Sequence, residues 1–246
     1  MLILFFSGNA LTNSLAAYYA FSSSARLLDN SFHSMDLNAS LVAPTFQSNC
    51  QWSGAECAVF SQVPISSGAG NYYMLPNLNV GSMSQANGFS ICMWLSFDAI
   101  DSWARVFDFG NGPDGHNILL ARLGTSTNLA FHLYVDSNNT KFEAILPTPI
   151  DLGVWRHVCI VNLGMNISLF ENGKLSLSFT INTIDNVLLT SNFIGKSNWE
   201  FDGMFRGKID EFRIYSKALS AADVTTIFSY QGFPFGIQTK KILSVF

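Results

Sequence analysis

The strongest constraint on the fold of this chain is the alternation of apolar and polar residues along it. Apolar side chains occupy every second position in the segments 89–97, 129–135 and 175–181. Because successive side chains of a strand point to opposite faces of a sheet, a period of two predicts half-buried antiparallel strands. Turns rich in glycine and asparagine separate the segments, and the Asn172-Gly173 pair predicts a tight hairpin. We therefore expect an all-β, two-sheet antiparallel sandwich.

One short helix is expected near the C-terminus. Ser220 and Asp223 have the spacing of a capping box, in which each side chain bonds to the backbone amide of the other. An apolar stripe follows, and Gly232 can end the helix. No linker or internal repeat divides the chain. We expect an N-terminal flank (1–12), one domain (13–232) and a C-terminal flank (233–246).

Charged residues make up only 12% of the chain, against about 25% in an average soluble protein. The net charge is −4, and no basic cluster is long enough to follow a phosphate backbone, so a nucleic-acid partner is not expected. The apolar runs are far shorter than the roughly 20 residues of a transmembrane helix. Neutral polar residues, among them 29 Ser and 21 Asn, must therefore supply much of the surface.

Three N-x-[ST] sequons are present, at Asn38, Asn138 and Asn166. In a secreted chain they are glycosylation acceptors, but a chain rich in Asn and Ser also produces sequons by chance. The first six residues are apolar, yet they lack the basic start and the length of a signal peptide. We expect an extracellular or cell-surface domain that is either cut from a longer chain or has an incomplete start.

Four cysteines allow three disulfide connectivities: they are Cys50, Cys57, Cys92 and Cys159. The first two enclose a short segment, and each of the other two lies in an apolar run typical of a strand. The alternative is four reduced, buried thiols in a cytosolic protein. Zinc is not indicated, because the chain has neither a C-x-x-C motif nor paired histidines.

Several motifs occur in the order found in one known superfamily. The most specific is FRGKIDEFRIYSKALS at 205–220, which follows VWRHVC at 154–159 and FENGK at 170–174. GFSICMW at 88–94 corresponds to a central strand, and LAAYYAF at 15–21 to an opening strand. Together these motifs resemble the laminin G-like, concanavalin A-like jelly roll, in its pentraxin and laminin G type three branch.

The resemblance implies a jelly-roll sandwich with a binding function. Domains of this family bind glycans, proteins or phosphorylated head groups through loops on one face or rim, many of them through Ca²⁺. We therefore expect a non-catalytic extracellular module that binds a glycan or glycoprotein, with a structural or adhesive protein–protein domain as the alternative. In pentraxins a disulfide joins the two strands that correspond to those of Cys92 and Cys159. The resemblance therefore implies a disulfide between these two cysteines. Proximity alone pairs Cys50 with Cys57.

A divergent glycoside hydrolase is the third alternative, because glucanases share this fold. Those that resemble family sixteen carry E-x-D-x-x-E on one strand, and retaining chemistry needs two carboxyl groups roughly 5–5.5 Å apart. Glu200 and Asp202 lack a third carboxylate at that spacing. Asp210 and Glu211 are adjacent, and adjacent strand residues should point to opposite faces. The sequence therefore predicts binding without catalysis.

Two oxygen-rich loops are candidate calcium sites, because Ca²⁺ takes 6–8 oxygen ligands. In the loop 108–117, Asp114 falls within one residue of a calcium ligand of the pentraxin pattern. The second half of the site would come from Asn198, Glu200 and Asp202, whose register departs from that pattern. The alternative at both loops is a set of hydrogen-bonded turns on a solvated acidic rim.

Asp210 lies in phase with Phe212 and Ile214, which predicts a carboxylate on the apolar face of its strand. A buried carboxylate must be paired or hydrogen-bonded. It is either a structural acceptor that ties a neighbouring loop near Asp29 or, together with Asp29, a ligand of a structural Ca²⁺.

Aromatic residues in loops are candidate ligand contacts. Trp103 and Trp199 flank the two oxygen-rich loops, and Asn111 lies within the first of them. Exposed aromatic faces stack on sugars and anchor protein partners, whereas the alternative role of each ring is to cap the core. We predict that these three residues contact the ligand.

Overall fold

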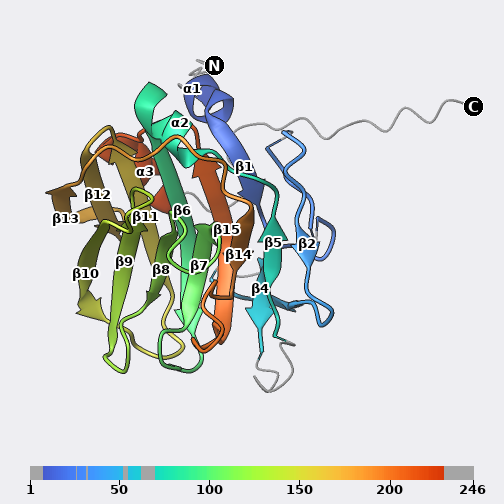
Figure 1. Cartoon of the computed structure of the whole chain (residues 1–246). Coiled ribbons are helices and arrows are strands. Elements are labelled where there is room, and N and C mark those ends of the chain that lie inside the picture. The colour runs from blue at the N-terminus through green and yellow to red at the C-terminus, as the bar shows by residue number, and fades with distance from the viewer. Residues whose placement is uncertain (1–7, 26, 32, 52–54, 62–69, 230–246) are drawn as a thin grey trace, which may run out of the picture.

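A computed structural model describes residues 8–229 of the chain, except 26, 32, 52–54 and 62–69. Two antiparallel sheets pack face to face (Figure 1), which confirms the predicted all-β sandwich. Residues 1–7, the predicted helix end at Gly232 and the flank 233–246 lie outside the described residues. No described helix is long and apolar enough to cross a membrane.

The strands of the two sheets follow in spatial order. The eight-stranded sheet runs β13 (Lys174–Thr180), β12 (Asn166–Glu171), β11 (Arg156–Leu163), β6 (Phe89–Phe97), β15 (Gly207–Tyr215), β4 (Glu56–Phe60) and β3 (Thr45–Ser48), with β1 (Leu15–Tyr19) also paired to β15. The seven-stranded sheet runs β10 (Lys141–Pro149), β9 (Asn128–Tyr134), β8 (Ile118–Arg122), β7 (Arg105–Gly110), β14 (Ser191–Ile194), β5 (Tyr73–Leu75) and β2 (Asn38–Ala39).

Three short helices accompany the sheets in the described part: α1 (Gly8–Asn13), α2 (Val80–Ala86) and α3 (Ala221–Ser229). The capping box of α3 is confirmed. The amide of Asp223 donates to Ser220 Oγ at 3.1 Å, and Asp223 Oδ2 accepts from the amide of Ser220 at 3.0 Å. The sequence did not predict α1 and α2, because six or seven residues are too few to display a helical stripe.

The main core fills the space between the two sheets. The residues that alternation placed on one face of β6 all lie in it: Phe89, Ile91, Met93, Leu95 and Phe97. On β9 the apolar set again faces this core, which leaves His132 and Tyr134 on the opposite, outer face of the seven-stranded sheet.

The expectation of half-buried strands is wrong for β6, because all nine of its residues are buried. A second apolar cluster covers the outer face of the eight-stranded sheet, with Leu11 from α1 and Val224 and Ile227 from α3. Cys92 lies in this cluster directly opposite Cys159 of β11. The disulfides Cys92–Cys159 and Cys50–Cys57 are both present, as expected.

Two strand bulges overturn predictions of side-chain direction. In β13 a register shift lies between the pairs Phe170–Leu175 and Leu169–Leu177, so Leu175 leaves the apolar face and is 57% exposed. In β15 the register shifts between Asp210 and Arg213. Asp210 pairs with Trp94, on the outer face of the sheet, and not with the core residues that follow it.

The same bulge corrects the expectation that Asp210 and Glu211 point to opposite faces. Glu211 has a φ of +53°, a left-handed conformation that is rare outside glycine. Its carboxylate accepts a hydrogen bond from Tyr18 at 2.9 Å and pairs with Arg213, both on the outer side of the sheet. One extra residue in the strand therefore places all of these polar groups in one buried layer.

Candidate ligand-binding site

A pocket of about 210 Å³ lies on the outer face of the seven-stranded sheet. Its lining comes from β7, β9, β10 and two loops: Trp103, Arg105, His132, Tyr134, Lys141, Trp199 and Asp202. On the floor, Lys141 of β10 stands opposite Tyr134 of β9. Glu143, which does not line the pocket, stands opposite the floor residue His132. The walls are the loop before β7 and the loop between β14 and β15. The site is therefore a hollow in a sheet face, walled by loops.

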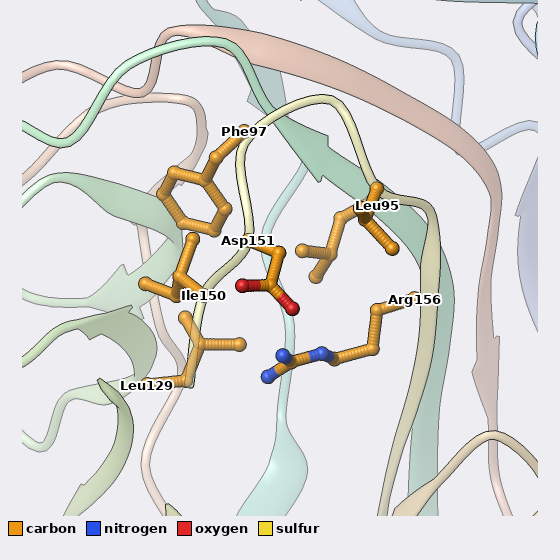
Figure 2. Close-up of a pocket in the computed structure, with 7 residues that line it drawn as sticks. Leu95, Phe97, Leu129, Ile150, Asp151 and Arg156 are labelled. Carbon is orange, nitrogen blue, oxygen red and sulfur yellow. The ribbon is translucent and has the colours of Figure 1, made fainter. Parts of the chain in front are cut away.

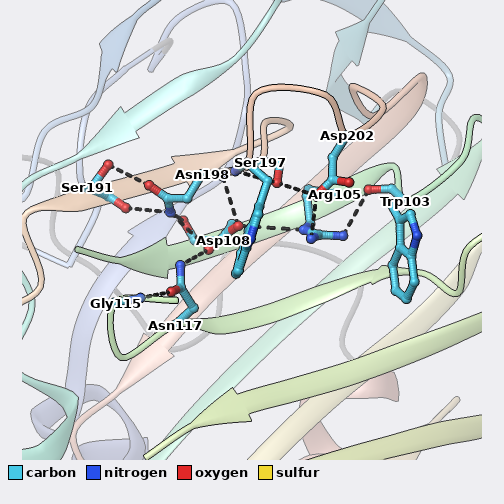
Figure 3. Close-up of polar contacts among 10 residues, drawn as sticks. Trp103, Arg105, Asp108, Gly115, Asn117, Ser191, Ser197, Asn198 and Asp202 are labelled. Carbon is cyan, nitrogen blue, oxygen red and sulfur yellow. Dashed lines mark hydrogen bonds and ion pairs between the residues drawn. The ribbon is translucent and has the colours of Figure 1, made fainter. Parts of the chain in front are cut away.

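Arg105 organises the walls of this pocket (Figure 3). Its guanidinium lies 5.6 Å from the ring centre of Trp103 and 5.2 Å from that of Trp199. It also donates to the carbonyl of Trp103 at 3.0 Å and to Asp202 Oδ2 at 2.6 Å. Because a cation over an aromatic face is attracted to the ring, Arg105 fixes two indoles that come from different loops.

A buried carboxylate, Asp108, anchors the loop that carries Trp199. Its oxygens accept from Nδ2 of Asn117 at 2.8 Å, and from the amide and Nδ2 of Asn198 at 3.0 and 2.9 Å (Figure 3). Burial raises the pKa of Asp108, and these hydrogen bonds and Arg105 oppose that effect. The sequence places Asp108 at the start of an oxygen-rich loop but does not predict that it anchors the loop of Trp199, although a lone carboxylate between two phenylalanines of a strand was a usable signal.

His132 contributes a neutral polar group to the floor. Its Nε2 lies 2.9 Å from Glu143 Oε2, and the edge of its ring packs on Trp103 at a centroid distance of 5.7 Å. Burial and the neighbouring ammonium of Lys141 lower the pKa of His132 to about 4, against the opposing effect of Glu143. The imidazole is therefore uncharged at neutral pH.

The structure brings together two of the three predicted ligand contacts. Trp103 and Trp199 both line the pocket, and Trp199 also packs on Tyr134. Asn111 lies elsewhere: its Nδ2 donates to the carbonyl of Leu188, and its Oδ1 accepts from the amide of Thr190. Asn111 thus ties the β7–β8 turn to the segment before β14 and does not line the pocket.

The predicted calcium ligands do not form a set that fits the ion. Asp114 and Glu200 are exposed, and Asn198 is hydrogen-bonded to Asp108. The carboxylate of Asp202 accepts from Arg105 and Ser197. The guanidinium of Arg105 already supplies the positive charge between the carboxylates. Among the described residues, no three His, Cys, Asp or Glu side chains are arranged to hold a metal ion. The calcium site stays a prediction.

Asp29 and Asp210 share no hydrogen-bond donor. Asp29 accepts from the amides of Tyr18, Ser31 and Met35 at 2.8–3.1 Å and from the hydroxyl of Ser31. Asp210 accepts from the amide of Glu211 at 2.8 Å. Each carboxylate therefore acts as a local structural acceptor, and the geometry gives the shared Ca²⁺ no support.

A second, smaller cavity lies at the sandwich edge (Figure 2). Its volume of about 10 Å³ is close to that of a single water molecule. Apolar side chains line most of it, and Asp151 and Arg156 supply its polar groups. It is too small to hold a sugar or a peptide side chain.

The three sequon asparagines, Asn38, Asn138 and Asn166, are all exposed. None of them lines the large pocket.

Comparisons with known proteins agree with this architecture. Residues 67–225 match the family described as the concanavalin A-like lectin/glucanases superfamily. No curated protein matches the chain in sequence. The ligand-binding domain of botulinum neurotoxin serotype D, solved with N-acetylneuraminic acid, has a TM-score of 0.66 and 18% identity, and the match covers 90% of this chain and 52% of that one.

Two further solved structures are similar. The binding domain of Paraclostridial Mosquitocidal Protein 1 has a TM-score of 0.65 and 16% identity over 89% of this chain and 52% of its own. Domain 4 of a GH43 extracellular arabinanase from Geobacillus stearothermophilus, solved with arabinotriose, has a TM-score of 0.61 and 21% identity over 87% and 98%. At these identities the similarity shows the fold alone. The chain spans about half the length of the toxin domains.

Proposed function

Because the chain belongs to the concanavalin A-like lectin/glucanases superfamily, we propose that it is a non-catalytic recognition module that binds a glycan or the glycan of a glycoprotein. The observation that carries the proposal is the pocket between Trp103 and Trp199. Two indole faces and a tyrosine stand beside hydrogen-bonding groups, which is the combination that sugars need: apolar ring faces for stacking and polar groups for hydroxyls.

The structural neighbours support a binding role. They include a domain solved with a sialic acid, a domain solved with an arabinan fragment and a toxin binding domain solved with rat synaptotagmin II. Because the last of these was solved with a protein, a protein partner is the alternative to a glycan. The two disulfides and the exposed sequons favour the secretory pathway, and we propose that the chain acts outside the cell as part of a larger protein.

A pair of tryptophan variants tests the proposal. Trp199→Ala and Trp103→Ala should each weaken glycan binding at least about tenfold, which corresponds to 1.4 kcal/mol, because each removes one stacking wall. Tyr72→Ala is the matched control: it removes a half-buried aromatic ring outside the pocket. Binding is read on a glycan array and then by calorimetry of the whole chain.

Three outcomes separate the alternatives. If no glycan binds, and a protein partner binds equally well to wild type and Trp199→Ala, the adhesive alternative replaces the proposal. If the chain hydrolyses β-glucan and Glu200→Gln abolishes this activity, the alternative of a divergent glycoside hydrolase replaces the proposal. Since the donor set does not fit calcium, we expect EDTA to leave glycan binding unchanged.

A further inference from the structure

We infer that the pocket selects an uncharged sugar unit and rejects glycans that present a carboxylate or sulfate to it. The inference rests on the proposed function and adds the chemical class of the ligand. It is carried by the pairing of the two cations that line the pocket, Arg105 and Lys141, with protein carboxylates.

Each cation of the pocket already has a protein carboxylate beside it. The guanidinium of Arg105 is only 4% exposed and is held by Asp202, by a carbonyl oxygen and by two indole rings. The ammonium of Lys141 lies 3.1 Å from Glu143 Oε2. A ligand carboxylate would have to displace Asp202 from the buried Arg105 or share the ammonium of Lys141 with Glu143. Recognition of acidic groups usually relies on an available arginine fork or lysine.

The oxygens that remain available favour hydroxyl groups. Arg105 and Ser197 both contact Oδ2 of Asp202, and His132 and Lys141 both contact Oε2 of Glu143. In the described part of the chain, Asp202 Oδ1 thus keeps its acceptor sites in the pocket, and the hydroxyl of Tyr134 has no hydrogen-bond partner. Glu143 Oε1 also keeps its acceptor sites, next to the lining residues Lys141 and His132. An ionised carboxylate can only accept hydrogen bonds. A sugar hydroxyl can donate to it, whereas a second carboxylate would be repelled.

The surrounding charge points the same way. Arg105 and Lys141 are balanced by Asp202 and Glu143, and the buried Asp108 lies 3.6 Å from Arg105 on its inner side. The neighbouring Lys196 does not line the pocket, and its ammonium stands 4.6 Å from the ring centres of Tyr72 and Phe193. The net charge of the whole chain is −4, which adds no attraction for an anion.

The test is a glycan array that carries neutral glycans next to their sialylated, uronic acid and sulfated forms, probed with the whole chain. We expect the bound glycans to be neutral, and each acidic form that places its charge on the bound unit to bind at least about tenfold more weakly. Affinity for a neutral glycan should stay within about twofold between roughly 50 and 500 mM NaCl, because no charge pair forms on binding.

Glu143→Gln provides a gain-of-function arm. The variant keeps the shape of the side chain but releases the ammonium of Lys141, so acidic glycans should gain about tenfold in affinity, and that gain should disappear at high salt. Circular dichroism checks that the variant is folded. Binding of acidic glycans in preference to their neutral forms by wild type would overturn the inference and leave the glycan-binding proposal standing. Binding of neither kind would overturn both.

Discussion

Arg105 shows how one residue defines the candidate site. It extends from a strand that the two sheets hold in place, and it joins two loops through stacked indoles and the carboxylate of Asp202. Asp108, on the same strand, then fixes one of these loops through Asn198. The pocket is thus built before any ligand arrives, which lowers the entropy lost on binding.

The buried Asp210 should make stability depend on pH. Burial raises its pKa to about 8, with Arg213 opposing, whereas an unfolded aspartate titrates near about 4. The folded chain therefore keeps a proton that the unfolded chain loses, so this contribution to stability falls as the pH rises towards 8. Between about pH 6.5 and 8 the free energy of unfolding should drop by up to about 1.4 kcal/mol per pH unit, measured by urea denaturation.

Asp210→Asn should flatten this slope, because the amide does not titrate. Asp98→Asn, a change in a more exposed surface ion pair with Lys208, is the control and should leave the slope unchanged. The buried His157 has a pKa lowered to about 3 by burial and Arg213, which reduces stability as the pH falls below about 6.5. His132, with its lowered pKa, acts in the same direction. Wild type and Asp210→Asn share both histidines, so the difference between their slopes isolates Asp210. A slope equal in wild type and Asp210→Asn would contradict the prediction.

At the scale of elements, the β12–β13 hairpin supports α3. Gly173 has a φ of +78°, and a Cβ added there would lie 2.8 Å from Phe228. Thr225 of α3 donates a hydrogen bond to the carbonyl of Gly173 at 3.1 Å. Phe228 in turn stacks on Trp94 of β6. The turn glycine therefore serves both the hairpin geometry and the close approach of the helix.

Gly173→Ala should lower the free energy of unfolding by about 1–3 kcal/mol more than Gly153→Ala. Both glycines have positive φ, but a Cβ at Gly153 meets nothing within 4 Å, so the control isolates the clash with Phe228. Urea denaturation measures the difference in the free energy of unfolding. Equal losses in the two variants would show that the helix does not rest on this turn.

For the whole molecule, the two disulfides should differ in their contribution to stability. Cys92–Cys159 spans 67 residues and Cys50–Cys57 spans 7. In the chain-entropy account, removing the longer link costs about 4 kcal/mol and the shorter about 2 kcal/mol. Calorimetric melting of Cys92→Ala/Cys159→Ala and Cys50→Ala/Cys57→Ala should therefore show the larger fall in Tm for the first pair. The reverse order would contradict this account.

Alternation, turn residues and the capping box were sufficient to predict the sandwich, the hairpin at Asn172 and Gly173, and α3, because these signals are local. The order of the motifs indicated the family and, through it, the disulfide between Cys92 and Cys159. Tertiary structure alone decided the rest. The bulge at Glu211 moved Asp210 to the outer face, because one extra residue inverts a period of two. The site depends on Trp103, Arg105 and Trp199, which are distant in sequence, and only the packing of strands and loops brings them together.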